Sequence, residues 1–192
     1  MVHYFRPRWL CMCGIAAGVR GKVNLGDILA ADPSWDWGSG KQDIRDGKSH
    51  FSPSPNQIPI ETGIRAKLKR YSRDAALLAT IRAGWPATKP DSALRLHVEP
   101  VASGAAVLAD RAYVDFINEQ QRKFVGVEME LYGMYVAGEN CSKPRPATFA
   151  LKSVCDFADE KKCDEYQAYA AYTSARFLYE FATRELPNSK DG

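Results

Sequence analysis

The chain has 192 residues, 45% of them hydrophobic and 26% charged, which is enough for one globular domain with a sizeable core. Its 26 basic residues nearly balance 23 acidic ones, and the net charge of +3 argues against nucleic acid as a partner. No apolar run is long enough to span a bilayer, and the N-terminus has no signal-peptide pattern, so no membrane partner is expected.

The five cysteines are odd in number and contain no Cys-x-x-Cys pair. Cys11, Cys13 and Cys155 lie in apolar, strand-like segments, where thiols behave as small hydrophobic groups. This pattern predicts a reduced, cytoplasmic protein without a metal site.

The first elements are apolar. Arg8–Val19 predicts a buried strand that runs into a small-residue turn at Gly14–Gly18, and Asp27–Ala31 predicts a second, short strand. From Asp32 to about residue 60, glycines, prolines, serines and charges surround Trp35 and Trp37, which predicts a loop excursion from the domain. These tryptophans could reach a neighbouring subunit or a substrate, or pack on their own domain.

Helical periodicity holds over residues 61–83, with a break near Ser72. The basic run Arg65–Arg70 lies within it and indicates a solvated helix face. Strands are predicted further on at 94–102, 124–129 and 147–154, and helices at 110–123, 130–140 and 164–183. The last helix has an inner stripe of Ala170, Thr173, Phe177 and Phe181.

Alternating strands and helices predict an α/β fold, a three-layer αβα sandwich with a central mixed, largely parallel sheet. Residues 1–192 are expected to form a single domain. The first strand is apolar enough to be central, and central parallel strands have neighbours on both sides, so we expect N-terminal strands of the sheet to be missing.

Three segments place polar or small residues at the ends of predicted strands, where open α/β sheets bind ligands. In Gly14–Gly18, Ile15, Ala16 and Ala17 would let backbone amides approach a ligand, although a plain tight turn explains the same residues. Glu128 and Glu130 flank Met129 where a strand becomes a helix. Either carboxylate could cap that helix or accept hydrogen bonds from vicinal sugar hydroxyls, and Met129 alone could be core.

Asp156 follows an apolar strand, with Asp159 and Glu160 just beyond it. A partly desolvated carboxyl can retain a proton near neutral pH, which suits general-acid catalysis. The alternative is that Asp156 caps the turn that leads to the last helix.

Together these segments resemble the nucleoside phosphorylase/nucleosidase superfamily, and most closely its methylthioadenosine/adenosylhomocysteine nucleosidase-like branch. The resemblance follows the order of four motifs, which are Gly14–Gly18 with Leu25-Gly26-Asp27-Ile28, then Val101-Ala102-Ser103-Gly104, then Val127-Glu128-Met129-Glu130, and finally Ser153–Asp159. The resemblance implies a purine nucleosidase that cleaves the N-glycosidic bond, needs no cofactor and forms a dimer.

The resemblance also implies roles for individual residues. Asp156 would protonate the purine as the bond breaks, Glu130 would hold the ribose hydroxyls, and Met129 would pack beneath the sugar. Val107 and Leu108 would line the base, and Ile15, Ala16 and Ala17 would face the attacking nucleophile. Lys152 stands where many relatives have an arginine that organises the acidic groups.

The sequence departs from the family pattern at several positions. Ile15 supplies no hydroxyl for phosphate, which favours hydrolysis of methylthioadenosine- or adenosylhomocysteine-like nucleosides over the alternative, purine nucleoside phosphorolysis. The resemblance implies an acidic residue that positions the attacking water on an N-terminal strand, and we expect that strand to be missing here. A catalytically impaired nucleoside-binding or signalling module, or a fragment, is therefore a further alternative.

Overall fold

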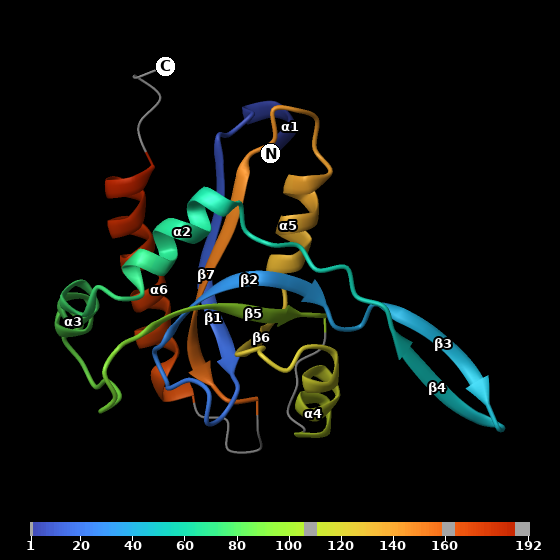
Figure 1. The fold of residues 1–192 in the computed structure, drawn as a ribbon. Coiled ribbons are helices and arrows are strands. Elements are labelled where there is room, and N and C mark those ends of the chain that lie inside the picture. The colour runs from blue at the N-terminus through green and yellow to red at the C-terminus, as the bar shows by residue number, and fades with distance from the viewer. Residues whose placement is uncertain (1, 106–110, 159–163, 187–192) are drawn as a thin grey trace.

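Five strands of the computed structural model close into a barrel within the residues that it describes, which are 2–105, 111–158 and 164–186 (Figure 1). They follow one another around the barrel in the order β1, β6, β5, β2, β7. Their bounds are Trp9–Gly18 for β1, Ile28–Asp36 for β2, Leu96–Ser103 for β5, Gly126–Glu128 for β6 and Ala147–Asp156 for β7.

The barrel consists of two sets of parallel strands that meet in antiparallel pairs. Strands β1 and β7 are parallel to each other, and so are β2, β5 and β6. The two sets join where β1 pairs with β6 and where β2 pairs with β7. The predicted α/β fold with a mixed sheet is therefore confirmed, but this sheet closes on itself where the sequence predicted the central layer of a sandwich.

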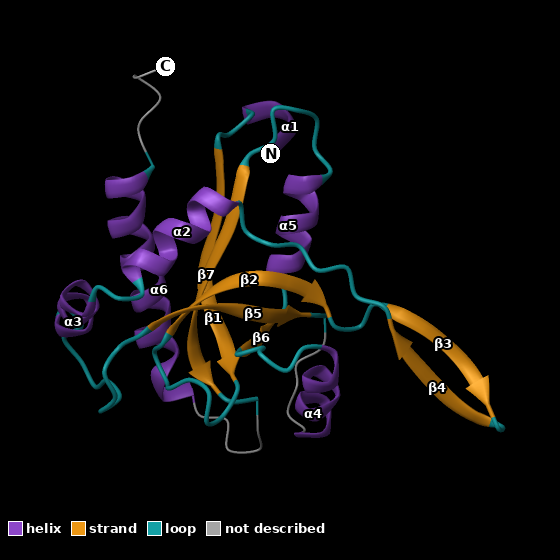
Figure 2. Cartoon of the chain, viewed as in Figure 1, coloured by secondary structure: helices purple, strands orange, loops and turns teal. Residues whose placement is uncertain are grey.

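Helices surround the barrel (Figure 2). Helix α6 packs on β7 and β1, and α5 packs on β7 and β2. The helices are α1 (Val2–Phe5), α2 (Thr62–Tyr71), α3 (Ala75–Ala83), α4 (Arg111–Gln120), α5 (Leu131–Glu139) and α6 (Gln167–Glu185), the last preceded by a 3₁₀ turn at Asp164–Tyr166. Across the described residues, none of these helices has the length and apolar character needed to cross a membrane.

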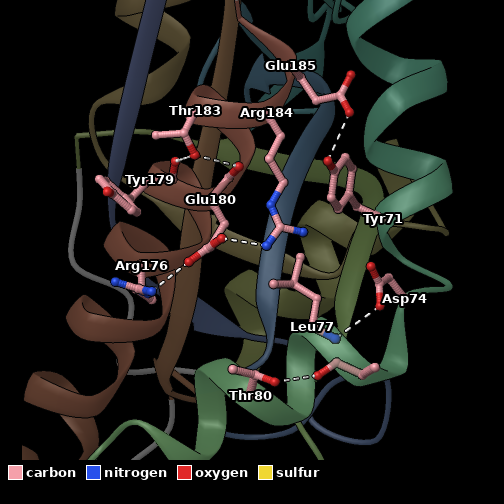
Figure 3. A network of polar contacts seen from close by, with 11 residues as sticks. Tyr71, Asp74, Leu77, Thr80, Arg176, Tyr179, Glu180, Thr183, Arg184 and Glu185 are labelled. Atoms are coloured by element: carbon pink, nitrogen blue, oxygen red, sulfur yellow. Dashed lines mark hydrogen bonds and ion pairs between the residues drawn. The ribbon is translucent and has the colours of Figure 1, made fainter.

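The inner stripe of α6 agrees with the sequence prediction. Ala170, Thr173, Phe177 and Phe181 are all fully buried. Tyr71 at the end of α2 packs edge-on against both phenylalanine rings. Its hydroxyl donates a 2.9 Å hydrogen bond to Glu185 at the end of α6 (Figure 3), so polar and apolar contacts together join these two helices.

The predicted break near Ser72 is also observed, because α2 ends at Tyr71 and α3 starts at Ala75. Asp74 caps α3 by accepting a hydrogen bond from the Leu77 amide at 3.0 Å (Figure 3). A side-chain cap stabilises the first turn of a helix, which explains why the chain restarts here.

The small residues of Gly14–Gly18 do not form the predicted turn; they continue β1. Gly14 pairs with Lys152, and Gly18 pairs with Gly126. A β-carbon at Gly14 would lie 3.2 Å from the Lys152 ammonium, and one at Gly18 would lie 2.6 Å from Val23. The lack of side chains at Gly14 and Gly18 makes room for neighbouring side chains.

The segment predicted as a loop from Asp32 onward contains three strands. Strand β2 continues to Asp36, and a hairpin of β3 (Gly40–Arg45) and β4 (Lys48–Pro53) projects from the barrel (Figure 1). Trp35 is fully buried, and its indole donates a 2.9 Å hydrogen bond to Gln120. Trp35 therefore packs on its own domain, the second of the two alternatives.

Candidate active site

Lys152 is the centre of the candidate site. It lies on β7 with only 4% of its surface exposed. Its ammonium is 3.1 Å from a carboxylate oxygen of Glu128 and 2.8 Å from one of Glu130. A buried cation requires such partners, and here both come from the junction between β6 and α5.

The carboxylate of Glu128 is buried and is bonded by other groups of the protein. Besides the contact with Lys152, it accepts hydrogen bonds from the backbone amides of Glu130, at 2.9 Å, and Leu131, at 3.0 Å. These are amides at the start of α5, and only 1% of the Glu128 side chain is exposed. The helix-cap interpretation of Glu128 thus fits its contacts better than direct contact with a substrate.

Glu130 differs from Glu128 in its exposure, since 60% of its side chain faces solvent. The hydrogen bond from Lys152 lowers the pKa of Glu130, against the opposing effect of partial burial. Burial would lower the pKa of Lys152, but the hydrogen bond with Glu130 and the charge of Glu128 outweigh it, so the pKa of Lys152 is raised. Glu130 is therefore an anchored, ionised acceptor that remains accessible.

A cavity of about 550 Å³ reaches this segment at Met129, whereas Glu128 and Glu130 are not among its described lining residues. Met129, which is 43% exposed, forms part of its wall. The Ser103 hydroxyl accepts a hydrogen bond of 3.3 Å from the Tyr132 amide, which ties β5 to the start of α5. The described lining residues are Asp36, Trp37, Gly38, Ser103, Gly104, Ala105, Met129, Tyr132 and Gly133.

Asp156 lies at the end of β7 and is half-buried. Ala17 pairs with Asp156 on one side and with Val127 on the other. Because neighbouring strands are about 4.8 Å apart, the backbones of Asp156 and Val127 are roughly 10 Å apart across β1. Strand β6 runs antiparallel to β1 and β7, so from Val127 the chain continues to Glu128 and Glu130 in the direction of Lys152, which pairs with Gly14.

Local contacts also fix the Asp156 carboxyl. One oxygen accepts a 2.9 Å hydrogen bond from the Ala158 amide, and Ala158 has a positive φ of 51°. The other oxygen is 3.5 Å from the Cys155 thiol. This is an Asx-type turn, as the capping alternative expects, and among the described residues the donor to the second oxygen is the weak Cys155 thiol.

The remaining predicted residues divide into two groups. Ile15, Ala16 and Ala17 lie on β1 between Asp156 and β6, so their strand separates the two acidic positions. Val107 and Leu108, predicted to line a base, and Asp159 and Glu160 are outside the described residues.

Sequence reasoning missed the contribution of β2 to this site. Asp36, Trp37 and Gly38 line the cavity, although no site was placed between Asp32 and Pro59. A tryptophan directly after an apolar strand was the available signal. Tyr135 was also missed. Its buried hydroxyl donates to the Ala31 carbonyl at 2.8 Å and accepts from the Ala150 amide at 3.1 Å, which fixes α5 on the barrel.

Comparisons with known proteins bear on this arrangement. No family model matches the chain. It is 37% identical over 174 residues to the uncharacterized protein y4jS of Sinorhizobium fredii, and 26% identical over 186 residues to the ATP nucleosidase Cap17 of Escherichia coli. Each match covers 91% of this chain, which spans 42% and 36% of the length of these two relatives.

Among solved structures, the 5′-methylthioadenosine/S-adenosylhomocysteine nucleosidase of Helicobacter pylori, crystallised with butyl-thio-DADMe-Immucillin-A, is similar with a TM-score of 0.72. The sequences are 21% identical, and the match covers 95% of this chain and 71% of that one. The chain therefore shares the fold of the methylthioadenosine/S-adenosylhomocysteine nucleosidases, which is the fold that the sequence resemblance implied.

Proposed function

We propose that this chain hydrolyses the N-glycosidic bond of methylthioadenosine- or adenosylhomocysteine-like purine nucleosides. The observation that carries the proposal is the ion-pair cluster of Lys152, Glu128 and Glu130 beside a cavity whose wall includes Met129. The cluster holds one exposed, ionised carboxylate in a fixed position, which suits a pair of ribose hydroxyls.

In this proposal Glu130 accepts hydrogen bonds from the ribose hydroxyls, and Met129 packs against the sugar. Cleavage passes through an oxocarbenium-like state, as in glycoside hydrolysis, so a fixed negative charge near the sugar strengthens its hydrogen bonds as positive charge develops. Lys152 and Glu128 are positioning residues, because they orient Glu130 and the start of α5.

Asp156 is the proposed general acid. A purine leaves as a poor, negatively charged group unless it is protonated, and a carboxyl positioned near a ring nitrogen can supply that proton. Val107 and Leu108 would contact the base, and Ile15, Ala16 and Ala17 would lie on the side from which water attacks. We place the reaction in the reducing cytoplasm, where free thiols persist, and expect the protein to act as a dimer.

Water is the proposed nucleophile, and phosphate is the alternative. Among the described residues that line the Met129 cavity, Asp36 is the one charged residue. This described lining contains no arginine or lysine. A phosphate dianion would bind beside cations, so the absence of arginine and lysine from this described lining favours water. Purine nucleoside phosphorolysis remains the second candidate reaction.

The test is adenine release from methylthioadenosine, adenosylhomocysteine and ATP, measured by chromatography with and without phosphate. ATP is included because of the similarity to the ATP nucleosidase Cap17. Adenine and free ribosyl product without phosphate support the proposal, and strict phosphate dependence rejects hydrolysis. Nucleoside binding by calorimetry without turnover would instead show a non-catalytic binding module.

Two variants test the assigned roles. Asp156→Asn removes the proton donor, so we expect kcat to fall by roughly 100-fold or more. Glu130→Gln weakens hydrogen bonds to the sugar, so kcat/KM should fall by roughly 10-fold to 100-fold. The matched controls are Asp46→Asn on the exposed hairpin turn and Glu139→Gln at the far end of α5. Full activity of Asp156→Asn would remove Asp156 as the acid.

A further inference from the structure

A second cavity, of about 700 Å³, lies at the opposite end of β5 from the candidate active site. Leu96 and His97 at the start of β5 line it, whereas Ser103 at the end of β5 lines the Met129 cavity. Seven residue steps at about 3.3 Å each separate the two ends by roughly 23 Å. A ligand in one cavity would therefore not touch the other.

The side chains that line this second cavity carry mostly positive charge. Arg82, Lys89 and Arg95 contribute three cations, and Asp91 contributes the opposing carboxylate. His97 also lines the cavity, but its ring is 2.9 Å from the buried carboxylate of Asp27. The local balance of formal charges, apart from the His97–Asp27 pair, is therefore clearly positive.

Backbone contacts hold two of these cations in place. Arg82 donates hydrogen bonds to the carbonyls of Ser92, at 3.1 Å, and Pro90, at 2.7 Å. The Lys89 ammonium lies 3.3 Å from the carbonyls of Arg82 and Trp85. Within the described parts of the chain, neither cation forms an ion pair with a carboxylate. Each keeps donors free, since a guanidinium has five N–H groups and an ammonium three.

Arg95, which lines the second cavity, has its backbone fixed by a hydrogen bond. The Arg95 amide donates a 3.0 Å hydrogen bond to Asp27, and the same carboxylate binds the His97 ring. Asp27 is fully buried, so this anchor is rigid. The exposed Arg95 side chain thus extends from a backbone that does not need to be ordered when a ligand binds, which lowers the entropic cost.

We propose that this second cavity is a binding site for a small phosphate-bearing ligand. Its volume lies within the range of about 300–1,000 Å³ typical of small-molecule sites. Arginine and lysine donors that lack carboxylate partners are the groups that bind phosphate oxygens, and two of the three are already held by carbonyls. The proposal is independent of the nucleosidase function, because it concerns other residues at the other end of β5.

The experiment titrates the ¹⁵N-labelled 192-residue chain with inorganic pyrophosphate and follows two kinds of NMR signal. The His97 ring reports on the second cavity, while the Trp37 indole reports on the Met129 cavity. His50 on the exposed hairpin is an internal reference. We expect a saturable shift at His97, with His50 and Trp37 unchanged.

Variants connect that shift to the proposed cations. Arg95→Gln and Lys89→Gln should each weaken pyrophosphate binding by about tenfold, the loss expected for one charged hydrogen bond. Lys41→Gln on the hairpin removes an exposed cation elsewhere and should leave the affinity unchanged. Arg95→Gln guards against a folding artefact, because the Arg95 side chain is exposed and forms no hydrogen bond or ion pair with the other described residues.

Three results would overturn the proposal. A shift at Trp37 alone would place the anion in the Met129 cavity. A shift at His97 that both cavity variants leave unchanged would mean that Arg95 and Lys89 do not bind it. A shift that never saturates, and that Lys41→Gln weakens as much as Arg95→Gln, would show only general attraction to a basic protein.

Discussion

Lys152 shows how one side chain can serve both stability and the proposed chemistry. Its ammonium contacts a buried carboxylate, Glu128, and an accessible one, Glu130. The first contact compensates the charge of the helix cap, and the second fixes the carboxylate that we propose binds the sugar. A lysine can make these contacts as a point charge, whereas an arginine would present a planar fork.

Replacing Lys152 by methionine should therefore be costly. It leaves the Glu128 carboxylate buried without its cation, and breaking a buried pair in this way typically costs about 3–5 kcal/mol of unfolding free energy. Lys67→Met is the control, because the Lys67 contact with Glu185 is more exposed and should be worth less than about 1 kcal/mol. Urea denaturation of both variants measures the difference, and equal losses would contradict this account.

The same cluster predicts a pH dependence. The pKa of Glu130 is lowered in the folded state, so its stabilising contribution is present above the unfolded value of about 4.3 and is lost as the pH falls through the lower folded pKa. The pKa of Lys152 is raised, so its contribution is present below about 10.4 and is lost as the pH rises through the higher folded pKa.

The stability difference between the native chain and Lys152→Met should therefore be largest between roughly pH 5 and pH 10 and should shrink on either side. Urea denaturation at a series of pH values checks this expectation. A difference that stays constant from pH 3 to pH 11 would mean that the ion pairs do not contribute to it.

At the scale of single elements, two glycine turns of similar backbone conformation have different surroundings. Gly26 and Gly47 have φ values of 83° and 73°, in the region that favours glycine. A β-carbon at Gly26 would lie 2.3 Å from the Tyr169 ring, while nothing lies within 4 Å of one at Gly47. The first glycine is needed for packing and for conformation, and the second for conformation only.

Alanine substitutions separate these two effects. Gly47→Ala should cost about 1 kcal/mol, the penalty of the left-handed conformation alone. Gly26→Ala adds a clash with a buried ring, so we expect a total loss of about 3 kcal/mol or more. Chemical denaturation provides the comparison; if the two variants lose the same stability, Tyr169 does not restrict the Gly26 turn.

Elements with a strong local signal were predicted well from the sequence. The stripe of α6 and the break between α2 and α3 depend on spacing and capping within one segment, and both are observed. Strand β2 was cut short because Pro33 and the polar residues around it indicate a loop. In the structure the pairing of β2 with β5 shifts register between Ala31 and Ser34, and such an irregularity accommodates a proline.

At the scale of the whole molecule, closure of the barrel could not be predicted. It depends on β1 pairing with both β6 and β7, which are distant in sequence, and no local pattern encodes those registers. The candidate site shares this property. The sequence named Glu130, Lys152 and Asp156, but only the pairing of β1 with β6 and β7 shows that they lie on neighbouring strands, with Lys152 four residues before Asp156 on β7.

The projecting hairpin contributes little to this closed body. None of the residues in β3 and β4 is buried, and the hairpin forms a sheet of its own. Replacing Lys41–Ser52 by two glycines should therefore keep cooperative unfolding and change the unfolding free energy by less than about 2 kcal/mol. Urea denaturation tests this, and Phe51→Ala isolates the ring contact with Phe116. Loss of a cooperative transition would show that the barrel depends on the hairpin.

Trp37 belongs to two hollows at once. It lines the Met129 cavity and also an aromatic cavity of about 460 Å³ formed with Phe51, Tyr113 and Phe116. A β-carbon at Gly104 would lie 2.2 Å from the indole nitrogen, so the indole fits only because position 104 has no side chain. The Trp37 indole thus lies between the two cavities. Because Trp37 lines both cavities, we expect a smaller residue at position 37 to join them.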